Sequence, residues 1–312
     1  MVFWGCFLVD RFSESQSGAN SDLLISSQRE PTRHGDRFFP LARYTLSFSK
    51  DFPLLPLHWH EEAELTLIQS GSCVYHIDLC EYPVREGDIV LLPPAVLHSA
   101  GSFPKYRMQS ESFVFHLNFL GIQSADICSM KYLLPFSSRD LRFPYVIPSD
   151  HAANPKLREI ICRMSDLYLQ QQDGYELLLK SLFFEIFSLL LPYRLTDAKD
   201  ADGSFSKSQS DKLKSVLDYI EMHYPEPLSV RDLAAICCFS EYHFMRFFKL
   251  HVGMTCTEYI NTLRLEKAWQ MLNKDRTPVL ETALSCGFHN LSYFYRLFRK
   301  KYHMTPKEVL RQ

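Results

Sequence analysis

The sequence predicts a multidomain α+β protein, in which an N-terminal β-barrel and a helical pair precede an all-helical C-terminal domain. The chain has 312 residues, more than the roughly 100 to 200 residues usual for one domain. Short apolar or alternating runs fill residues 40–119, whereas helical periodicity dominates from residue 211 onward. With 46% hydrophobic and 22% charged residues, the composition excludes the disordered and fibrous classes.

Residues 37–150 are expected to form the β-domain, and residues 40–119 within it have an all-β pattern. Apolar or alternating runs bounded by turn residues predict strands that include residues 64–69, 73–79 and 88–92. Residues 1–36, which precede them, are expected to form an irregular segment, and nothing in their pattern indicates a role.

A pair of amphipathic helices follows the barrel within residues 151–193, with Gly174 between the two helices. The apolar stripe of the first helix includes Leu157, Ile161, Met164, Leu167 and Tyr168. This stripe can pack on the barrel of the same chain or on a second copy. Residues 194–210 are polar and have little to bury, which predicts a flexible linker between domains.

Residues 211–312 form the expected helical domain, with helices at 212–223, 230–237, 241–251, 257–272, 279–286, 291–302 and 306–311. Thr255 with Glu258, and Thr305 with Glu308, match the Thr-x-x-Glu capping box. This domain holds 15 Lys and Arg against 11 Asp and Glu, and its basic excess favours a polyanionic partner.

The cysteines and the apolar stretches indicate a cytoplasmic protein that does not enter a membrane. The nine cysteines form no Cys-x-x-Cys pair, and we interpret Cys162, Cys237 and Cys286 as reduced core residues. A zinc site or a disulfide framework is the alternative. The most apolar stretch, residues 182–191, is far shorter than the ~20 residues that a bilayer requires.

The helical domain contains an internal repeat of about 50 residues. Residues 244–249, Phe-Met-Arg-Phe-Phe-Lys, recur as Phe-Tyr-Arg-Leu-Phe-Arg at 294–299, and upstream an offset of 49 pairs Ala234 with Ala283. Each copy therefore has a short helix with a small alanine, a tight turn and a second helix. This layout predicts two helix-turn-helix units, at about residues 229–252 and 279–302, joined by the helix at 257–272.

The second helix of each unit has two contrasting faces. The apolar face consists of Phe244, Phe247 and Phe248 and, fifty residues later, Phe294, Leu297 and Phe298. The other face consists of Tyr242, Met245, Arg246 and Lys249, and then of Ser292, Tyr295, Arg296 and Arg299. A free face with arginine, on a helix that fits the ~12 Å major groove of DNA, can read base edges, and Arg246 and Arg296 are the candidates for guanine. A merely solvated basic face is the alternative, which the repetition disfavours.

His58, His60 and Glu64 stand at even spacing, so on a strand they project from one face. His98 can approach the same face from a neighbouring strand. Three imidazoles and a carboxylate are a suitable ligand set for a first-row divalent metal.

Residues 211–312 resemble the DNA-binding module of the AraC/XylS family. The resemblance is carried by Gly287-Phe-His-Asn-Leu-Ser-Tyr-Phe-x-Arg-x-Phe-Arg-Lys-x-x-x-x-Thr-Pro306. It implies base or backbone contacts by Tyr242, Met245, Arg246, Ser292, Tyr295 and Arg296. Cys238 and His303 depart from the family by standing where glycine is usual, and apolar Met245 favours contact with a thymine methyl group.

The histidine region resembles both motifs of the cupin barrel, in which His58, His60, Glu64 and His98 match the usual metal ligands. It departs from that pattern at Phe52, Ser102 and Ala95, where Ala95 replaces a turn glycine. AraC-like barrels usually hold a small organic effector without metal, so we expect no resident cofactor. The expected effector-binding residues are His58, His60, Glu64, Tyr75 and His98, and Tyr75 or His76 lines the pocket.

The resemblance implies a cytoplasmic, homodimeric, sequence-specific transcription factor that binds promoter DNA and responds to a small effector, a sugar or related metabolite. It is compatible with a contact to RNA polymerase, and it favours a dimer interface on the stripe of the first helix within 151–193. No enzymatic activity is expected. A metal-dependent cupin enzyme tethered to a DNA-binding module and an architectural DNA binder with a vestigial sensor are the alternatives.

Overall fold

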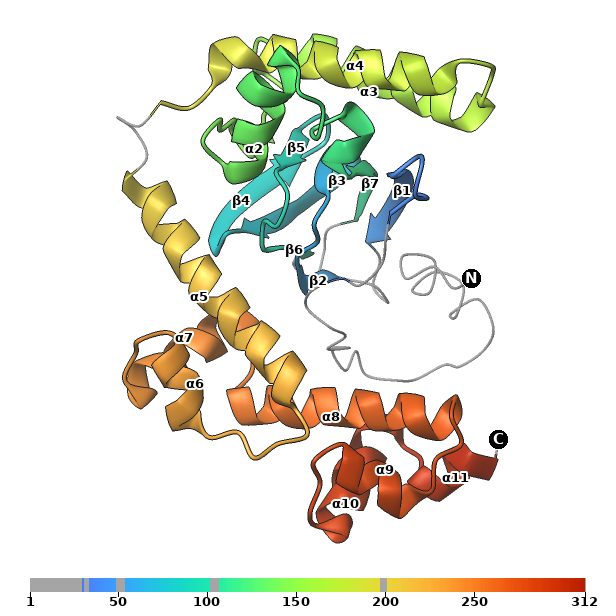
Figure 1. Cartoon of the computed structure of the whole chain (residues 1–312), viewed down its shortest axis with the longest axis vertical. Helices are drawn as coiled ribbons and strands as arrows, with labels where there is room; N and C mark the ends of the chain where they lie inside the picture. The colour runs from blue at the N-terminus through green and yellow to red at the C-terminus, as the bar shows by residue number, and fades with distance from the viewer. Residues whose placement is uncertain (1–29, 31–33, 49–53, 102–106, 197–200, 312) are drawn as a thin grey trace. The chain divides into compact units, whose positions relative to one another are not determined.

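The computed structural model describes residues 30, 34–48, 54–101, 107–196 and 201–311, so almost all of the segment 1–36 lies outside the described residues. The described residues divide into two compact units, within residues 30–206 and 207–311. The first unit holds the strands and the second is helical (Figure 1). Among the helices described, none combines the length and the apolar character needed to cross a membrane.

The strands of the first unit are antiparallel and form two connected parts. One part has the order β1 (Leu41–Phe48), β7 (Met108–Phe115), β3 (Ala63–Ile77), β5 (Ile89–Leu92) and β8 (Val146–Ile147). In the other, β6 (His98–Gly101) pairs with β2 (Leu54–His58) and with β3, and β3 also pairs with β4 (Cys80–Arg85). Strand β3 therefore belongs to both parts.

Strand β3 replaces the two strands predicted at 64–69 and 73–79. It continues through Gly71, whose φ is 78° and where an added Cβ would lie 1.7 Å from the carbonyl oxygen of Arg107. It ends at Ile77 because Asp78 and Leu79, with φ of 46° and 68°, make the tight turn into β4. A residue without a side chain thus lets one strand pass where the sequence pattern indicated a break.

Alternate residues of the strands build two hydrophobic clusters. Phe48, Tyr75 and Met108 belong to an inner cluster, whereas Leu65, Phe113 and Phe115 belong to an outer cluster that the helices complete. The helices of this unit are η1 (Leu117–Leu120), η2 (Ser129–Leu133), α2 (Leu134–Ser138), α3 (Asn154–Gln170), α4 (Tyr175–Leu190) and η3 (Leu191–Tyr193). The first three lie within the range predicted as barrel and are too short for a clear periodic signal.

The apolar stripe of α3 faces its own barrel, which corrects the favoured dimer assignment. Leu157, Ile161 and Met164 are at most 1% exposed and belong to the outer cluster, against which Leu167 and Tyr168 also pack. Asn154 fixes the start of α3 by donating hydrogen bonds to Gly87 O and Ile147 O. By contrast Cys162, predicted to be buried, is exposed on the opposite face of α3.

The second unit contains part of α5 (Ala201–His223), then α6 (Val230–Ile236), α7 (Glu241–Val252), α8 (Cys256–Asn273), α9 (Val279–Ser285), α10 (Leu291–Tyr302) and α11 (Pro306–Arg311). Helix α5 corrects the linker predicted at 194–210, because residues 201–210 are helical. The buried stripe of Leu213, Leu217 and Ile220 extends one turn back to Ser210, which is fully buried. A serine at an inward position gave no apolar signal in the sequence.

Candidate functional site

Two short helices and a turn build the first helix-turn-helix unit. Ser229 begins α6 and accepts a hydrogen bond from the backbone N–H of Asp232. Ser240 begins α7 and accepts one from the N–H of His243. Ala234 of α6 is 1% exposed, so this small side chain lies at the contact between the helices.

The second helix-turn-helix unit repeats this design with different residues. Asn290 begins α10 and accepts a hydrogen bond from the N–H of Tyr293, and Ala283 of α9 is again 1% exposed. In the turn, Gly287 has a φ of 80°, and a Cβ there would lie 2.5 Å from the carbonyl oxygen of Pro225. This position therefore requires glycine.

The recognition helices α7 and α10 divide into buried and exposed faces as the repeat predicts. Phe244, Phe248, Phe294 and Phe298 are fully buried, and Phe247 is 7% exposed. The exposed side chains include Tyr242, Met245, Arg246, Lys249, Ser292, Arg296 and Arg299. Tyr295 differs from the expectation, because it is half-buried and packs against the core of its unit together with Leu297.

Helix α8 connects the two helix-turn-helix units (Figure 1) and begins at a capping box. Thr255 and Glu258 form the expected capping box at its start, and Thr305 and Glu308 form the same arrangement before α11. The second helix-turn-helix unit also presents a concave basic surface, which is lined by Tyr295, Arg296, Arg299, Lys300 and Thr305. Its charge is complementary to a phosphate backbone.

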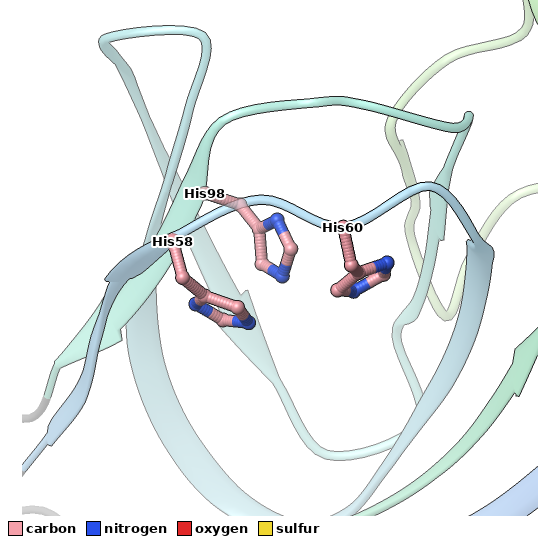
Figure 2. Close-up of side chains that lie close together, drawn as sticks. All are labelled: His58, His60 and His98. Carbon is pink, nitrogen blue, oxygen red and sulfur yellow. The ribbon is translucent and has the colours of Figure 1, made fainter. Parts of the chain in front are cut away.

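In the barrel, sheet register brings three histidines together. His58 of β2 lies opposite His98 of β6 in the antiparallel pair, and His60 follows two residues after His58. Their ligand atoms lie within 4.8 Å of one another, and the rings project toward a common centre (Figure 2). The ring centres of His58 and His98 are 4.2 Å apart.

Each of these imidazoles uses Nδ1 for a backbone contact. His58 Nδ1 lies 2.8 Å from Pro56 O, His98 Nδ1 lies 2.9 Å from Val96 O, and His60 Nδ1 lies 3.0 Å from Glu62 O. A carbonyl oxygen only accepts, so each Nδ1 donates and Nε2 is left for other partners. Metal-binding histidines are oriented in the same way. His98 Nε2 is moreover buried without a hydrogen bond among the described residues, so the cluster fits a cation.

Glu64 gives the centre its negative charge. Its Oε2 lies 3.4 Å from His98 Nε2 and 3.7 Å from His60 Nε2. Burial opposes its ionisation, but the contacts with both histidines outweigh that effect and hold the pKa of Glu64 well below its usual range. Burial, reinforced by His98 and His60, lowers the pKa of His58 to about 3. At neutral pH the histidine cluster therefore combines the ionised carboxylate of Glu64 with the neutral imidazole of His58.

Two family models match separate parts of the chain. The model described as an AraC-like ligand binding domain matches residues 50–187, and the model described as a helix-turn-helix domain matches residues 233–312. The chain belongs to the AraC/XylS family. This regulator of transcription therefore has a DNA-binding helix-turn-helix domain and a ligand-binding domain.

Two curated relatives match nearly the whole regulator. It is 25% identical over 293 residues to the uncharacterized HTH-type transcriptional regulator YdeC of Bacillus subtilis (strain 168), covering 91% of this chain and 96% of the relative. It is 23% identical to the HTH-type transcriptional activator RhaS of Escherichia fergusonii, covering 88% and 95%.

Two solved structures are also similar. The DNA-binding domain of AdpA in complex with a target DNA is 26% identical and covers 32% of this chain and 90% of its own, with a TM-score of 0.31. Wild-type ToxT from Vibrio cholerae strain SCE256 with bound unsaturated fatty acid is 16% identical and covers 86% and 94%, with a TM-score of 0.37.

Within this AraC-type regulator, the expected effector-site residues gather on the inner side of the barrel. Thr66 Oγ1 donates to Glu64 at 2.8 Å and lies 2.7 Å from Ser112 Oγ, which extends the polar cluster from β3 to β7. Tyr75 is 1% exposed in the inner cluster, whereas His76 is turned outward and lies 3.5 Å from Glu81. Tyr75 is thus the inward member of the pair that the sequence left open.

Sequence reasoning missed Glu30 and His34. Glu30 Oε2 lies 3.9 Å from His58 Nε2 and 3.6 Å from His34 Nε2, and the His34 ring lies 5.3 Å from the His60 ring. His34 Nδ1 also lies 2.8 Å from the Tyr44 hydroxyl. Burial opposes the ionisation of Glu30, but His34 outweighs it and lowers its pKa. Both residues belong to a segment without periodic pattern, so no sequence signal indicated them.

Proposed function

We propose that this regulator binds an operator sequence-specifically through both helix-turn-helix units and alters transcription when a small effector binds the barrel. The observation that carries the proposal is the repeated recognition helix. In α7 and α10 the phenylalanines of one face are buried, while arginine and hydrogen-bonding side chains are exposed on the other. Two matching copies on one domain favour base readout over a solvated face.

Arg246 and Arg296 are the proposed readers of guanine, because guanidinium can donate two hydrogen bonds to O6 and N7 of that base. Each guanidinium lies near a tyrosine ring of its own helix, 5.8 Å from the centre of Tyr242 and 5.2 Å from that of Tyr293. These contacts restrict the arginine side chains before DNA is bound. Met245, 47% exposed, suits contact with a thymine methyl group.

Lys249, Ser292, Tyr295 and Arg299 complete the proposed DNA contacts as partners of phosphate or base edges. Helix α8 has 18 residues, or about 27 Å at 1.5 Å per residue. A connector of this length can hold two recognition helices near the ~34 Å spacing of successive major grooves.

Selection of genomic fragments by the full-length protein at near-physiological salt tests this proposal. Sequencing of the retained fragments is expected to show one motif with two blocks about one helical turn apart. Retention without an enriched motif would show binding to phosphate alone, and sequence-specific regulation would then be wrong.

We propose that the effector binds in the barrel at the histidine cluster. The residues of this effector site are His58, His60, Glu64, Tyr75 and His98. Imidazoles, a carboxylate and a phenol can exchange hydrogen bonds with hydroxyl groups, which is compatible with a sugar or related metabolite. An effector shifts DNA binding only if it binds two states of the protein unequally. Titration of the operator complex with candidate sugars is therefore expected to change its affinity.

We further propose that the regulator acts as a homodimer and contacts RNA polymerase at promoters. A dimer supplies up to four recognition helices to one site, which increases specificity and salt dependence. Since the stripe of α3 packs on its own barrel, we propose that the interface uses other residues of the helical pair.

A metal-dependent enzyme tethered to a DNA-binding module is the second candidate function. The three convergent imidazoles favour it, because they leave Nε2 atoms for a metal. Assays of metal-supplemented protein with sugars and phenols test it, and turnover of any of them would establish this function.

A further inference from the structure

The loop that leads into the first helix-turn-helix unit lies against the turn of the second one. Residues 224–229 form this loop, between α5 and α6. The turn of the second helix-turn-helix unit approaches it at Gly287, where an added Cβ would lie 2.5 Å from Pro225 O and 3.0 Å from the Arg264 guanidinium. The two helix-turn-helix units are therefore in contact here, as well as being connected by α8.

The α5–α6 loop is held to the first helix-turn-helix unit from both of its ends. At one end Ser229 caps α6. At the other, α5 contacts the turn that follows α6: Lys212 Nζ lies 4.5 Å from the centre of the Phe239 ring, and Lys212 O accepts a hydrogen bond from Cys237 Sγ at 3.6 Å. A group that binds the loop is thus held in place relative to the first recognition helix.

Arg264 of α8 joins this loop to the turn of the second helix-turn-helix unit with one guanidinium group. Its Nε donates to Tyr224 O and its Nη2 donates to Glu226 O, each at 2.7 Å. The guanidinium carbon also lies 5.9 Å from the centre of the Phe288 ring, which follows Gly287 and is 3% exposed. Because the donors of a guanidinium form a rigid fork, two bonds to one loop fix the orientation of the group.

We propose that Arg264 is a positioning residue that fixes the distance and the angle between α7 and α10, and thereby the number of base pairs that the regulator accepts between the two blocks of its operator. The inference rests on the proposed operator binding and deepens it. Each inserted base pair shifts one block by about 3.4 Å along the DNA axis and turns it by about 35° around that axis. Two recognition helices held at a fixed distance follow such a shift only if the DNA is deformed, which costs free energy.

Selection from random duplex DNA by the full-length protein, followed by fluorescence anisotropy, tests the inference. Wild type is expected to enrich two blocks at one spacing, and to lose about tenfold in affinity when one base pair is inserted between them. Arg264→Met keeps the unbranched stem of the side chain and removes every donor. It is expected to enrich the same two blocks at several spacings, with the loss caused by the inserted base pair reduced to about threefold.

Lys267→Met is the matched control, because Lys267 lies nearly one turn further along α8 and pairs with Glu221 of α5 at 2.6 Å. It removes a charged contact of the same helix, leaves the Arg264 bonds in place and is expected to keep the spacing preference of wild type. Arg264→Lys keeps the charge but lacks the fork, so it is expected to relax the spacing as Arg264→Met does. Circular dichroism checks that each variant is folded, and Arg264→Lys serves for the comparison if Arg264→Met is not.

Two results would overturn the inference. The first is that the folded Arg264 variants enrich a single spacing and show the wild-type loss on insertion, which would reduce Arg264 to a contributor to stability. The second is an equal loss of affinity for all spacings and for random DNA, which would assign Arg264 to phosphate binding. If wild type itself enriches no motif, the proposed operator binding is wrong and the inference falls with it. The behaviour of wild type therefore distinguishes the two failures.

Discussion

At the residue scale, three of the side chains with left-handed backbone stand where the family patterns have glycine. Ala95, Cys238 and His303 have φ of 58°, 55° and 54°, at the three positions where the family patterns have glycine. A left-handed conformation costs a residue with a Cβ roughly 1 to 2 kcal/mol. The chain therefore keeps the turns of its family while carrying local strain in each.

Replacing His303 by glycine is expected to stabilise the protein by about 0.5 to 1 kcal/mol, because the C-cap of α10 is left-handed and His303 is exposed. Gly253, the equivalent cap of α7, has a φ of 81° and open space around an added Cβ. Gly253→Ala is thus the opposite control and should lose a similar free energy of unfolding in urea titration. Equal effects of both substitutions would contradict this account.

Arg296 is the residue whose removal most directly tests base readout. Arg296→Ala is expected to weaken operator binding by about 1 to 3 kcal/mol and to relax the preference at one base position. Lys300→Ala, on the same basic surface, should weaken binding to operator and random DNA equally. It should also reduce the slope of log binding constant against log salt concentration by about 1. Equal loss on both DNAs for Arg296→Ala would assign Arg296 to phosphate. The measurement is fluorescence anisotropy at several salt concentrations.

At the scale of elements, aromatic side chains hold α10 to the linker helix α8. The Phe298 ring stacks on Trp269 with ring centres 5.9 Å apart and lies 4.7 Å from Tyr302, which itself lies 4.4 Å from Trp269. An ion pair of 2.8 Å between Lys301 and Glu266 joins the same two helices. The orientation of the second recognition helix therefore depends on one aromatic cluster.

Phe298→Ala is expected to destabilise the second helix-turn-helix unit by about 3 to 5 kcal/mol, since the ring is fully buried and leaves a cavity. Leu284→Ala in α9 is the control, because Leu284 is 51% exposed. Urea unfolding of both variants, followed by circular dichroism, measures the difference. An unchanged midpoint for Phe298→Ala would refute the packing assignment.

At the scale of the whole molecule, the helical pair has one covered face and one open face. The stripe of α3 is buried against the barrel, whereas Leu169, Leu177 and Leu178 near the α3–α4 turn are 63%, 74% and 41% exposed. Exposed leucines on neighbouring helices are a suitable contact for a second copy. They replace the buried stripe as candidates for the dimer interface.

Substitution of Leu177 and Leu178 by lysine is expected to weaken homodimerisation at least tenfold, because two charges would enter an apolar contact. Sedimentation equilibrium of the full-length protein measures this change. Leu250→Lys in α7, at a leucine that is 76% exposed, is the control. A monomeric wild type would contradict the dimer, and equal dimerisation of all variants would place the interface elsewhere.

The sequence by itself determined the elements whose signal is local. The two faces of α7, the capping boxes and the spacing of His58, His60 and Glu64 follow from intervals of a few residues, because helices and strands impose fixed periods on neighbouring side chains. The repeat of the helix-turn-helix units follows from comparing short segments of the chain at an offset of about 50 residues. The helix predicted at 212–223 is shorter than α5, because a local pattern depends on apolar side chains. Ser210 is buried but polar, so it breaks the apolar period.

Only the tertiary structure decided how distant segments meet. The register of β2 against β6 places His58 opposite His98, and a backbone hydrogen bond to Trp59 brings Glu30 beside them. Packing likewise decided that Leu157 faces its own barrel, because a helix stripe is equally apolar whichever surface covers it. Sheet register and choice of packing partner depend on contacts between residues far apart in the chain, which local periodicity does not encode.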